Sequence, residues 1–188
     1  MAITKIQSES LNLADDFAFT GTITGAGGGK VLQVVQTVKT DTFSSSSTSW
    51  IDVTGLSVSI TPASTSNKVL IMITANFSAN EHIQAKLVRN STDLFIGDAA
   101  GSRTRASYNT FGRIGSGSDL GGTGYLGAVP MSVSYLDSPA TTSSTTYKIQ
   151  TIVAAGSYIS YVNKTALDTD AASLGRLASS ITAYEIAG

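Results

Sequence analysis

The stretch that decides the fold is KVLIMITANF, residues 68–77. It contains the apolar run Val69-Leu70-Ile71-Met72-Ile73 and is rich in β-branched side chains, which favour strands. A strand in a two-layer sandwich normally keeps one face in water, so a strand that is apolar on both faces is expected to be covered on both. We therefore predict a strand that is covered on both faces, with a neighbouring subunit or a long loop as its second cover.

Segments with period-2 alternation surround this stretch on both sides. Turn-forming residues separate them, as in TPASTSN at 61–67 and DSPATTSS at 137–144. No segment has the 3.6-residue periodicity of a long helix. The pattern predicts an all-β sandwich or barrel. The expected strands are residues 31–39, 50–53, 56–61, 68–77, 83–89, 94–97, 129–136, 146–154, 158–163 and 177–186.

The composition restricts the classes of function. Charged residues make up 13% of the 188 residues, which is about half the usual share, and Ser, Thr, Gly and Asn take their place. Such a surface suits a module that packs against copies of itself. The net charge of −1 gives no support for nucleic acid or an anionic membrane surface as a partner. No apolar run is long enough for membrane insertion, and the N-terminus lacks the pattern of a signal peptide.

Catalytic and metal-binding motifs are weak. Without cysteine, disulfides, zinc–thiolate sites and thiol nucleophiles are excluded. His82 is the only histidine and no Gly-x-Ser-x-Gly motif accompanies it, so we interpret it as structural or solvated. Asp168 and Asp170 are expected to cap a turn, with an oxygen-ligated ion on an oligomer axis as the alternative. The sequence GTGYLG at 122–127 matches a dinucleotide-binding pattern, but Pro130 follows where a helix should begin. We predict no enzyme activity and no cofactor.

The glycine-rich stretch TGAGGGKVLQVV, residues 24–35, divides the chain. A phosphate-binding loop would need glycine at Thr24 and a hydroxyl at Val31, and it would open into a helix rather than a β-branched run. We interpret the stretch as a hinge between an N-terminal arm, residues 1–29, and a β domain, residues 30–188. The hinge glycines are Gly25, Gly27, Gly28 and Gly29. The arm is too poor in apolar residues for a core of its own, so we expect it to become ordered only against another surface. Its apolar residues are Ile3, Ile6, Leu11, Leu13, Phe17, Phe19 and Ile23.

The least regular part of the domain is residues 98–127, where we expect extended surface loops. Arginine forks and aromatic faces suit saccharides and acidic groups, so this region is the candidate recognition site. The alternative is a solvated loop with salt links between subunits. The candidate residues are Arg103, Arg105, Tyr108, Phe111 and Arg113.

Several blocks of the sequence resemble phage virion proteins. The segment SESLNLADDFAFTGTITGAGGGKVLQVVQ, residues 8–36, resembles the N-terminal stretch of tail fibres and related appendages of marine bacteriophages, especially cyanophages. Residues 50–79, 85–98, 131–150 and 179–186 resemble the trimeric jelly-roll module of these proteins, which is similar to the C1q and tumour-necrosis-factor fold. The resemblance implies an antiparallel jelly-roll sandwich and a threefold homotrimer. We predict that the trimer interface includes Leu70, Met72, Val133 and Tyr135.

Two functions are compatible with this resemblance. The first is a short tail fibre or appendage of the virion, which attaches through its arm to another virion protein and binds a host-surface polysaccharide with its head. The second is a capsid decoration protein that stabilises the shell. In either case the resemblance implies localisation in the virion after synthesis in the host cytoplasm.

Overall fold

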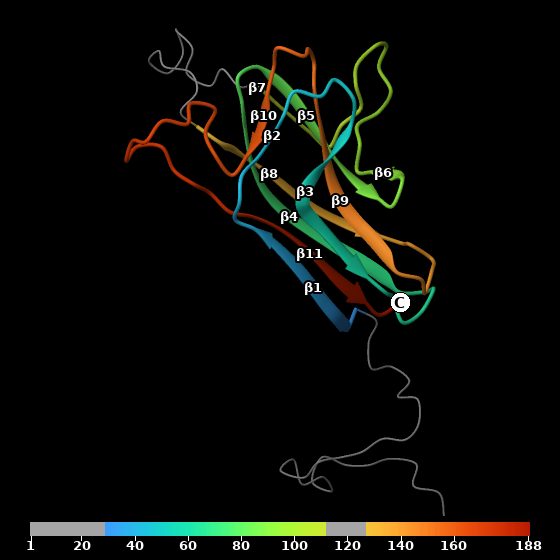
Figure 1. Ribbon diagram of the computed structural model, residues 1–188. Coiled ribbons are helices and arrows are strands. Elements are labelled where there is room, and N and C mark those ends of the chain that lie inside the picture. The colour runs from blue at the N-terminus through green and yellow to red at the C-terminus, as the bar shows by residue number, and fades with distance from the viewer. Residues whose placement is uncertain (1–28, 112–126) are drawn as a thin grey trace, which may run out of the picture.

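The computed structural model describes residues 29–111 and 127–188. In these ranges the chain is all-β, with two antiparallel sheets packed face to face (Figure 1). Sheet A consists of β1 (Val31–Lys39), β2 (Phe43–Ser45), β4 (Lys68–Ala79), β8 (Val129–Asp137), β10 (Ser160–Val162) and β11 (Ser179–Ile186). Sheet B consists of β3 (Ile51–Ile60), β5 (His82–Arg89), β6 (Thr92–Leu94), β7 (Tyr108–Phe111) and β9 (Thr145–Val153). The expected all-β class is therefore confirmed. The described residues contain no helix that is long and apolar enough to cross a membrane.

Strand β4 lies in the middle of sheet A, and its outer face is not covered within the described chain, since Met72 is 46% exposed. One of its edges pairs with β11 from Lys68 to Thr74 and then with β10 from Phe77 to Ala79. Its other edge pairs with β8 from Val69 to Phe77. Strand β1 extends the sheet beyond β11, so the longer strands follow the order β1-β11-β4-β8. In sheet B, β9 lies between β3 and β5, and the far edge of β5 pairs with β6 and β7.

The core fills the space between the sheets, and several polar side chains are buried with its apolar ones. Tyr147 and Phe77 are its largest fully buried side chains. The core face of β4 is fully apolar, whereas the carboxylate of Glu185 on β11 is buried at 2% exposure. It accepts hydrogen bonds from the Ala63 amide and from the side-chain amide of Asn67, both at 2.6 Å. These donors replace the water that a buried carboxylate would otherwise need.

Most expected strands are confirmed within a few residues, with four differences. The expected strand at 94–97 shares only Leu94 with β6, which spans Thr92–Leu94. The expected strands at 50–53 and 56–61 form one strand, β3, because a bulge at Gly55 keeps the chain in the same sheet. Gly55 has φ +80°, which glycine adopts without strain. Strands β2 and β7 were not predicted, because β2 lies in a serine-rich segment and β7 within the expected loop region.

The two ends of the sandwich differ in what they carry. The described chain begins at Gly29, which has φ +92° and whose amide donates to the Ala187 carbonyl at 3.2 Å. This end holds the start of β1 and the end of β11 (Figure 1). Strand β7 pairs with the first residues of β5, at the opposite end of the twelve-residue β4. At about 3.3 Å per residue, β4 separates the two ends by roughly 40 Å.

Most of the predicted arm and hinge lies outside the described residues. This holds for Ile3, Ile6, Leu11, Leu13, Phe17, Phe19, Ile23, Gly25, Gly27 and Gly28.

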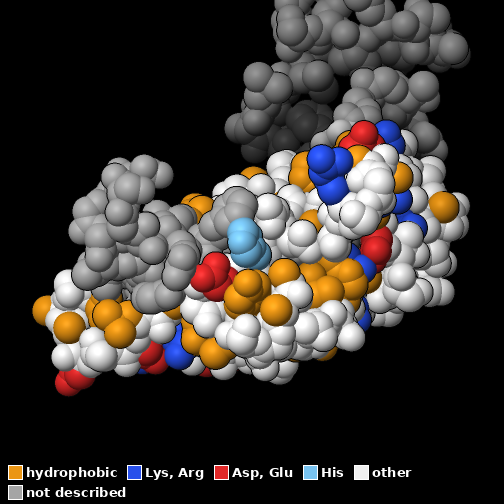
Figure 2. All heavy atoms as spheres, turned by 90° about the horizontal axis from the view of Figure 1, so that it is seen from above, with side chains coloured by type: hydrophobic (Ala, Val, Ile, Leu, Met, Phe, Trp, Pro, Cys, Tyr) orange, Lys and Arg blue, Asp and Glu red, His pale blue; other side chains and the backbone are white. Residues whose placement is uncertain are grey.

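The end that carries β7 is seen in Figure 2, where hydrophobic side chains form a band and charged side chains are scattered around it. His82 is exposed at this end, with its ring centre 6.2 Å from that of Tyr158.

Candidate functional site

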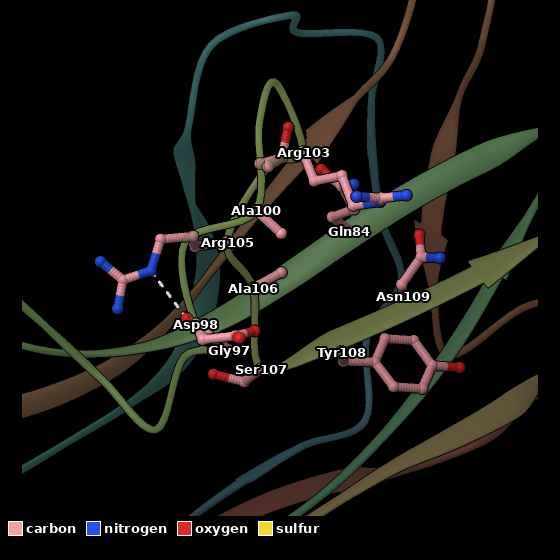
Figure 3. Close-up of a pocket in the computed structure, with 11 residues that line it drawn as sticks. Gln84, Gly97, Asp98, Ala100, Arg103, Arg105, Ala106, Ser107, Tyr108 and Asn109 are labelled. Atoms are coloured by element: carbon pink, nitrogen blue, oxygen red, sulfur yellow. Dashed lines mark hydrogen bonds between the residues drawn. The ribbon is translucent and has the colours of Figure 1, made fainter.

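The connection between β6 and β7 forms a pocket along the edge of sheet B, with a cavity volume of about 460 Å³ (Figure 3). Ser107 fixes the connection to β5. Its amide donates to the Ala85 carbonyl at 3.0 Å, and its hydroxyl oxygen accepts from the Leu87 amide at 3.1 Å. The connection is also closed on itself, because the Gly97 amide donates to the Ala106 carbonyl at 3.2 Å. The pocket is therefore bound to the rigid sheet on one side.

Three polar side chains converge at one side of this pocket. Gln84 on β5 and Asn109 on β7 are direct cross-strand partners, so their side chains leave the same face of sheet B. Arg103 extends from the connection toward both of them (Figure 3). Arg103 is exposed, and no acidic side chain within residues 29–111 and 127–188 forms an ion pair with it. A guanidinium fork and two amides can together bind carboxylate and hydroxyl groups.

Arg105 has a different position from Arg103. Its side chain points to the other side of the connection, and Nε donates to the Gly97 carbonyl at 2.7 Å (Figure 3). This hydrogen bond joins the two ends of the turn that forms the pocket wall. The structure thus places both predicted arginines at the pocket, but only Arg103 reaches toward Gln84 and Asn109.

Tyr108 is half-buried and connects the two sheets. Its ring stacks on Phe77 of β4, with 5.7 Å between ring centres, and its hydroxyl donates to the Val129 carbonyl at 3.1 Å. Burial raises the pKa of Tyr108, and a hydrogen bond with Thr110 offsets part of this effect. The ring is therefore largely engaged in packing, which corrects the expectation that it offers a free stacking surface.

The other two predicted recognition residues cannot be assigned to the pocket. The backbone of Phe111 pairs with His82 at the end of β7, but its side chain lies outside the described residues. Arg113 lies outside them as well. Sequence reasoning missed Gln84 and Asn109, since only the pairing of β5 with β7 places these two amides side by side.

A second candidate site is the outer face of sheet A, the face turned away from the core. One cross-strand row on it reads Val34, Tyr184, Leu70 and Leu136. Met72 lies in the next row and is 46% exposed, and Val34 and Leu136 are exposed to similar degrees. Between Met72, Ser134 and Tyr184 the surface is hollowed, with a volume of about 430 Å³. Lys68 is the only charged residue of β1, β4, β8 and β11 whose register places it on this face.

The predicted trimer residues divide between the two faces of sheet A. Leu70 and Met72 point outward. Val133 and Tyr135 are the partners of Ile73 and Ile71, which belong to the core. Val133 is only 6% exposed and Tyr135 packs against the core, so both lie on the core face of β8, and their place in a trimer interface stays a prediction. The residues of β8 that alternate with Val133 and Tyr135 along the strand point outward, and Leu136 is one of them.

The outer face of sheet B is polar, in contrast to that of sheet A. Lys148 donates to Asp52 at 2.8 Å, and so does Gln150. Partial burial alone would raise the pKa of Asp52, but these two hydrogen bonds lower it overall. Lys86 forms an ion pair with Asp93 at 2.7 Å, and its ammonium group lies 4.5 Å from the centre of the Trp50 ring. These charges are matched within the chain and suit a face in contact with water.

Asp168 is engaged in ion pairs within the chain. Asp168 accepts from Arg176 and, at 3.0 Å, from Lys164. Hydrogen bonds from Arg176 and then Lys164 lower the pKa of Asp168. Within residues 29–111 and 127–188 no group of three or more His, Asp or Glu side chains could coordinate a metal ion.

Comparison with protein families finds none that matches this chain. A search of curated proteins finds no matching relative either.

Proposed function

We propose that this protein is a structural component of a phage virion, a short tail fibre or appendage. In this proposal the N-terminal arm attaches to another virion protein, and residues 30–188 form a homotrimeric jelly-roll head that binds the host surface. No catalytic residue is assigned. The sequence resemblance to tail fibres of marine phages motivates the proposal, and three features of the structure support it.

The strand order supports the jelly-roll assignment. Eight strands, counted along the chain as β1, β3, β4, β5, β7, β8, β9 and β11, form two four-stranded layers. Their orders are 1-8-3-6 in sheet A and 2-7-4-5 in sheet B. Consecutive strands alternate between the layers except for the fourth and fifth, which is the order expected for two Greek keys wound into a jelly roll.

The observation that carries the proposal of self-association is the difference between the outer faces of the two sheets. The outer face of sheet A carries one apolar row, uncharged hydroxyl and amide side chains beside it, and Lys68 as its one charge, whereas that of sheet B carries matched ion pairs. An exposed apolar sheet face is typical of an interface between proteins. Three copies around an axis would cover this face and leave the polar faces outward, and the threefold order itself comes from the resemblance.

The positions of Gly29 and the pocket support attachment at one end and recognition near the other. The arm would leave the sandwich at Gly29, beside the end of β11. The pocket lies beside β7 and the first half of β5, toward the opposite end. A head with this polarity can be anchored while its pocket faces away from the virion.

Two measurements test the proposal. Sedimentation equilibrium of the full chain should give three times the mass of one chain, 19.4 kDa, and a monomer at micromolar concentration would contradict it. Quantitative mass spectrometry of virions against the major capsid protein should give a few tens of copies or fewer. Hundreds of copies per particle would instead support the alternative, a capsid decoration protein.

A further inference from the structure

We propose that the pocket beside β5 and β7 binds an acidic saccharide, with Arg103 holding the sugar carboxylate and Gln84 and Asn109 binding its hydroxyl groups. This inference rests on the proposed host-binding function and specifies its ligand class. It also assigns roles to two residues, Gln84 and Asn109, that the sequence did not indicate.

The first argument concerns charge. Every other arginine in the described ranges has a fixed partner: Arg89 pairs with Asp137, Arg105 with the Gly97 carbonyl and Arg176 with Asp168. Among these residues only the Arg103 guanidinium has no such partner, and it lies over a concave surface. A planar guanidinium prefers a carboxylate or phosphate that accepts two parallel hydrogen bonds. The ligand group that suits the Arg103 guanidinium best is therefore an anion with two oxygens that can both accept hydrogen bonds.

The second argument concerns the neighbouring amides. Gln84 and Asn109 each offer a carbonyl acceptor and an NH₂ donor, which is the combination that a sugar hydroxyl requires. Their cross-strand pairing fixes their spacing on the sheet. Asp98 lies on the exposed wall of the same pocket and can accept from further hydroxyls. Groups of this kind fit a ligand with many hydroxyls and one carboxylate better than they fit a phosphate or a hydrophobic molecule.

The third argument concerns rigidity. Side chains on paired strands and on a wall closed by backbone hydrogen bonds lose little freedom when a ligand binds. Ser107 ties this wall to Ala85 and Leu87, and Arg105 ties it to Gly97. The cavity of about 460 Å³ falls in the range for a small ligand such as one or two sugar units.

The test compares two probes that differ only in their carboxylates. One is a tetramer of galacturonic acid, and the other is the same tetramer with each carboxylate reduced to a primary alcohol. Titration calorimetry of the full-length chain should show that the acid tetramer binds at least about tenfold more tightly. Equal affinity for the two probes, or no binding of the acid, would overturn the inference.

Single substitutions show which side chains cause the preference for the acid tetramer. Arg103→Gln keeps the polarity of the side chain but removes its charge, and it should remove the preference for the acid tetramer. Arg176→Gln is the matched control, because it removes the same charge from an exposed side chain that does not line the pocket, and the preference should remain. Gln84→Ala and Asn109→Ala should weaken the binding of both tetramers. Equal losses in Arg103→Gln and Arg176→Gln would indicate nonspecific attraction and overturn the assignment.

The outcome can be separated from that of the proposed function. The trimer mass and the copy number per virion do not depend on which sugar is bound. If both agree with a fibre but the reduced tetramer binds equally well, the acidic ligand class is wrong and the fibre proposal stands. If the chain is monomeric and the acid preference still depends on Arg103, the pocket stands and the trimer proposal falls.

Discussion

Asp137 on β8 accepts a hydrogen bond from the hydroxyl of Tyr147 on β9 at 2.6 Å, so a polar contact joins the two sheets inside the sandwich. The Asp137 carboxylate also accepts two hydrogen bonds from Arg89 of β5, at 2.7 and 2.8 Å. Tyr147 is fully buried and Asp137 is 4% exposed. Arg89 and Tyr147 both donate hydrogen bonds to the Asp137 carboxylate, so removing one of these side chains leaves a buried polar group without its hydrogen-bond partner.

Asp137→Ala and Tyr147→Phe should both lower the unfolding free energy of the domain, and Asp137→Ala should lower it more. Asp137→Ala leaves the Arg89 guanidinium partly buried without its carboxylate, and we expect a loss of about 3 kcal/mol. Tyr147→Phe removes one hydrogen bond to a carboxylate, at a cost of about 1–2 kcal/mol. Urea unfolding at fixed protein concentration measures both changes. The double variant should lose less than the sum of the two, and simple additivity would show that the contact does not couple the sheets.

Tyr147 should also make the protein sensitive to alkali. Burial, together with the hydrogen bond to Asp137, raises the pKa of Tyr147 well above its ordinary value. The folded state keeps this proton while the unfolded chain releases it, so its contribution is fully present below about pH 10 and is lost above. Above pH 10, the unfolding free energy of Tyr147→Phe should fall less steeply than that of the wild type, by about 1.4 kcal/mol per pH unit. Parallel curves would contradict this role.

A charge on the outer face of sheet A should disrupt self-association. Met72→Glu introduces a carboxylate into an almost uncharged face, and covering it would require removing water from an unpaired charge. We expect the association constant to fall by at least about a hundredfold, measured by sedimentation equilibrium. Ser57→Glu is the control, because Ser57 is exposed on β3 and pairs with Lys148 on the polar face of sheet B. A Met72→Glu protein with unchanged mass would exclude this face from the interface.

The bulge in β3 should depend on glycine. Gly55→Ala would place a side chain at φ +80°, and its Cβ would lie 3.4 Å from Nζ of the buried Lys39. We expect a loss of about 1–2 kcal/mol in unfolding free energy, because a non-glycine residue is strained in this conformation. Gly156→Ala serves as the control, since its new methyl group would enter open space, with no atom beyond its chain neighbours within 4 Å, and its φ is not positive. Equal effects of the two substitutions would contradict the strain argument.

Much of the secondary structure was predictable from the sequence, and much of the site was not. Alternation identified strands such as Val31–Lys39, because a strand buried on one side alternates in polarity, and the apolar, β-branched run at 69–73 identified most of Lys68–Ala79. Strand β7 was not identified, since Tyr108–Phe111 is short and its pairing with His82–Ala85 is a long-range contact. The loop arginines were selected by residue type, but their directions depend on the backbone around Gly97.

The sequence by itself determined the all-β class and the absence of cysteine chemistry. These follow from local spacing and composition, which act along the chain. Only the tertiary structure decided that Met72 faces outward while Val133 faces the core, because an apolar run on β4 is compatible with either register. Pairing between distant strands also brought Gln84 to Asn109 and Asp137 to Tyr147, since register couples residues that no local pattern relates.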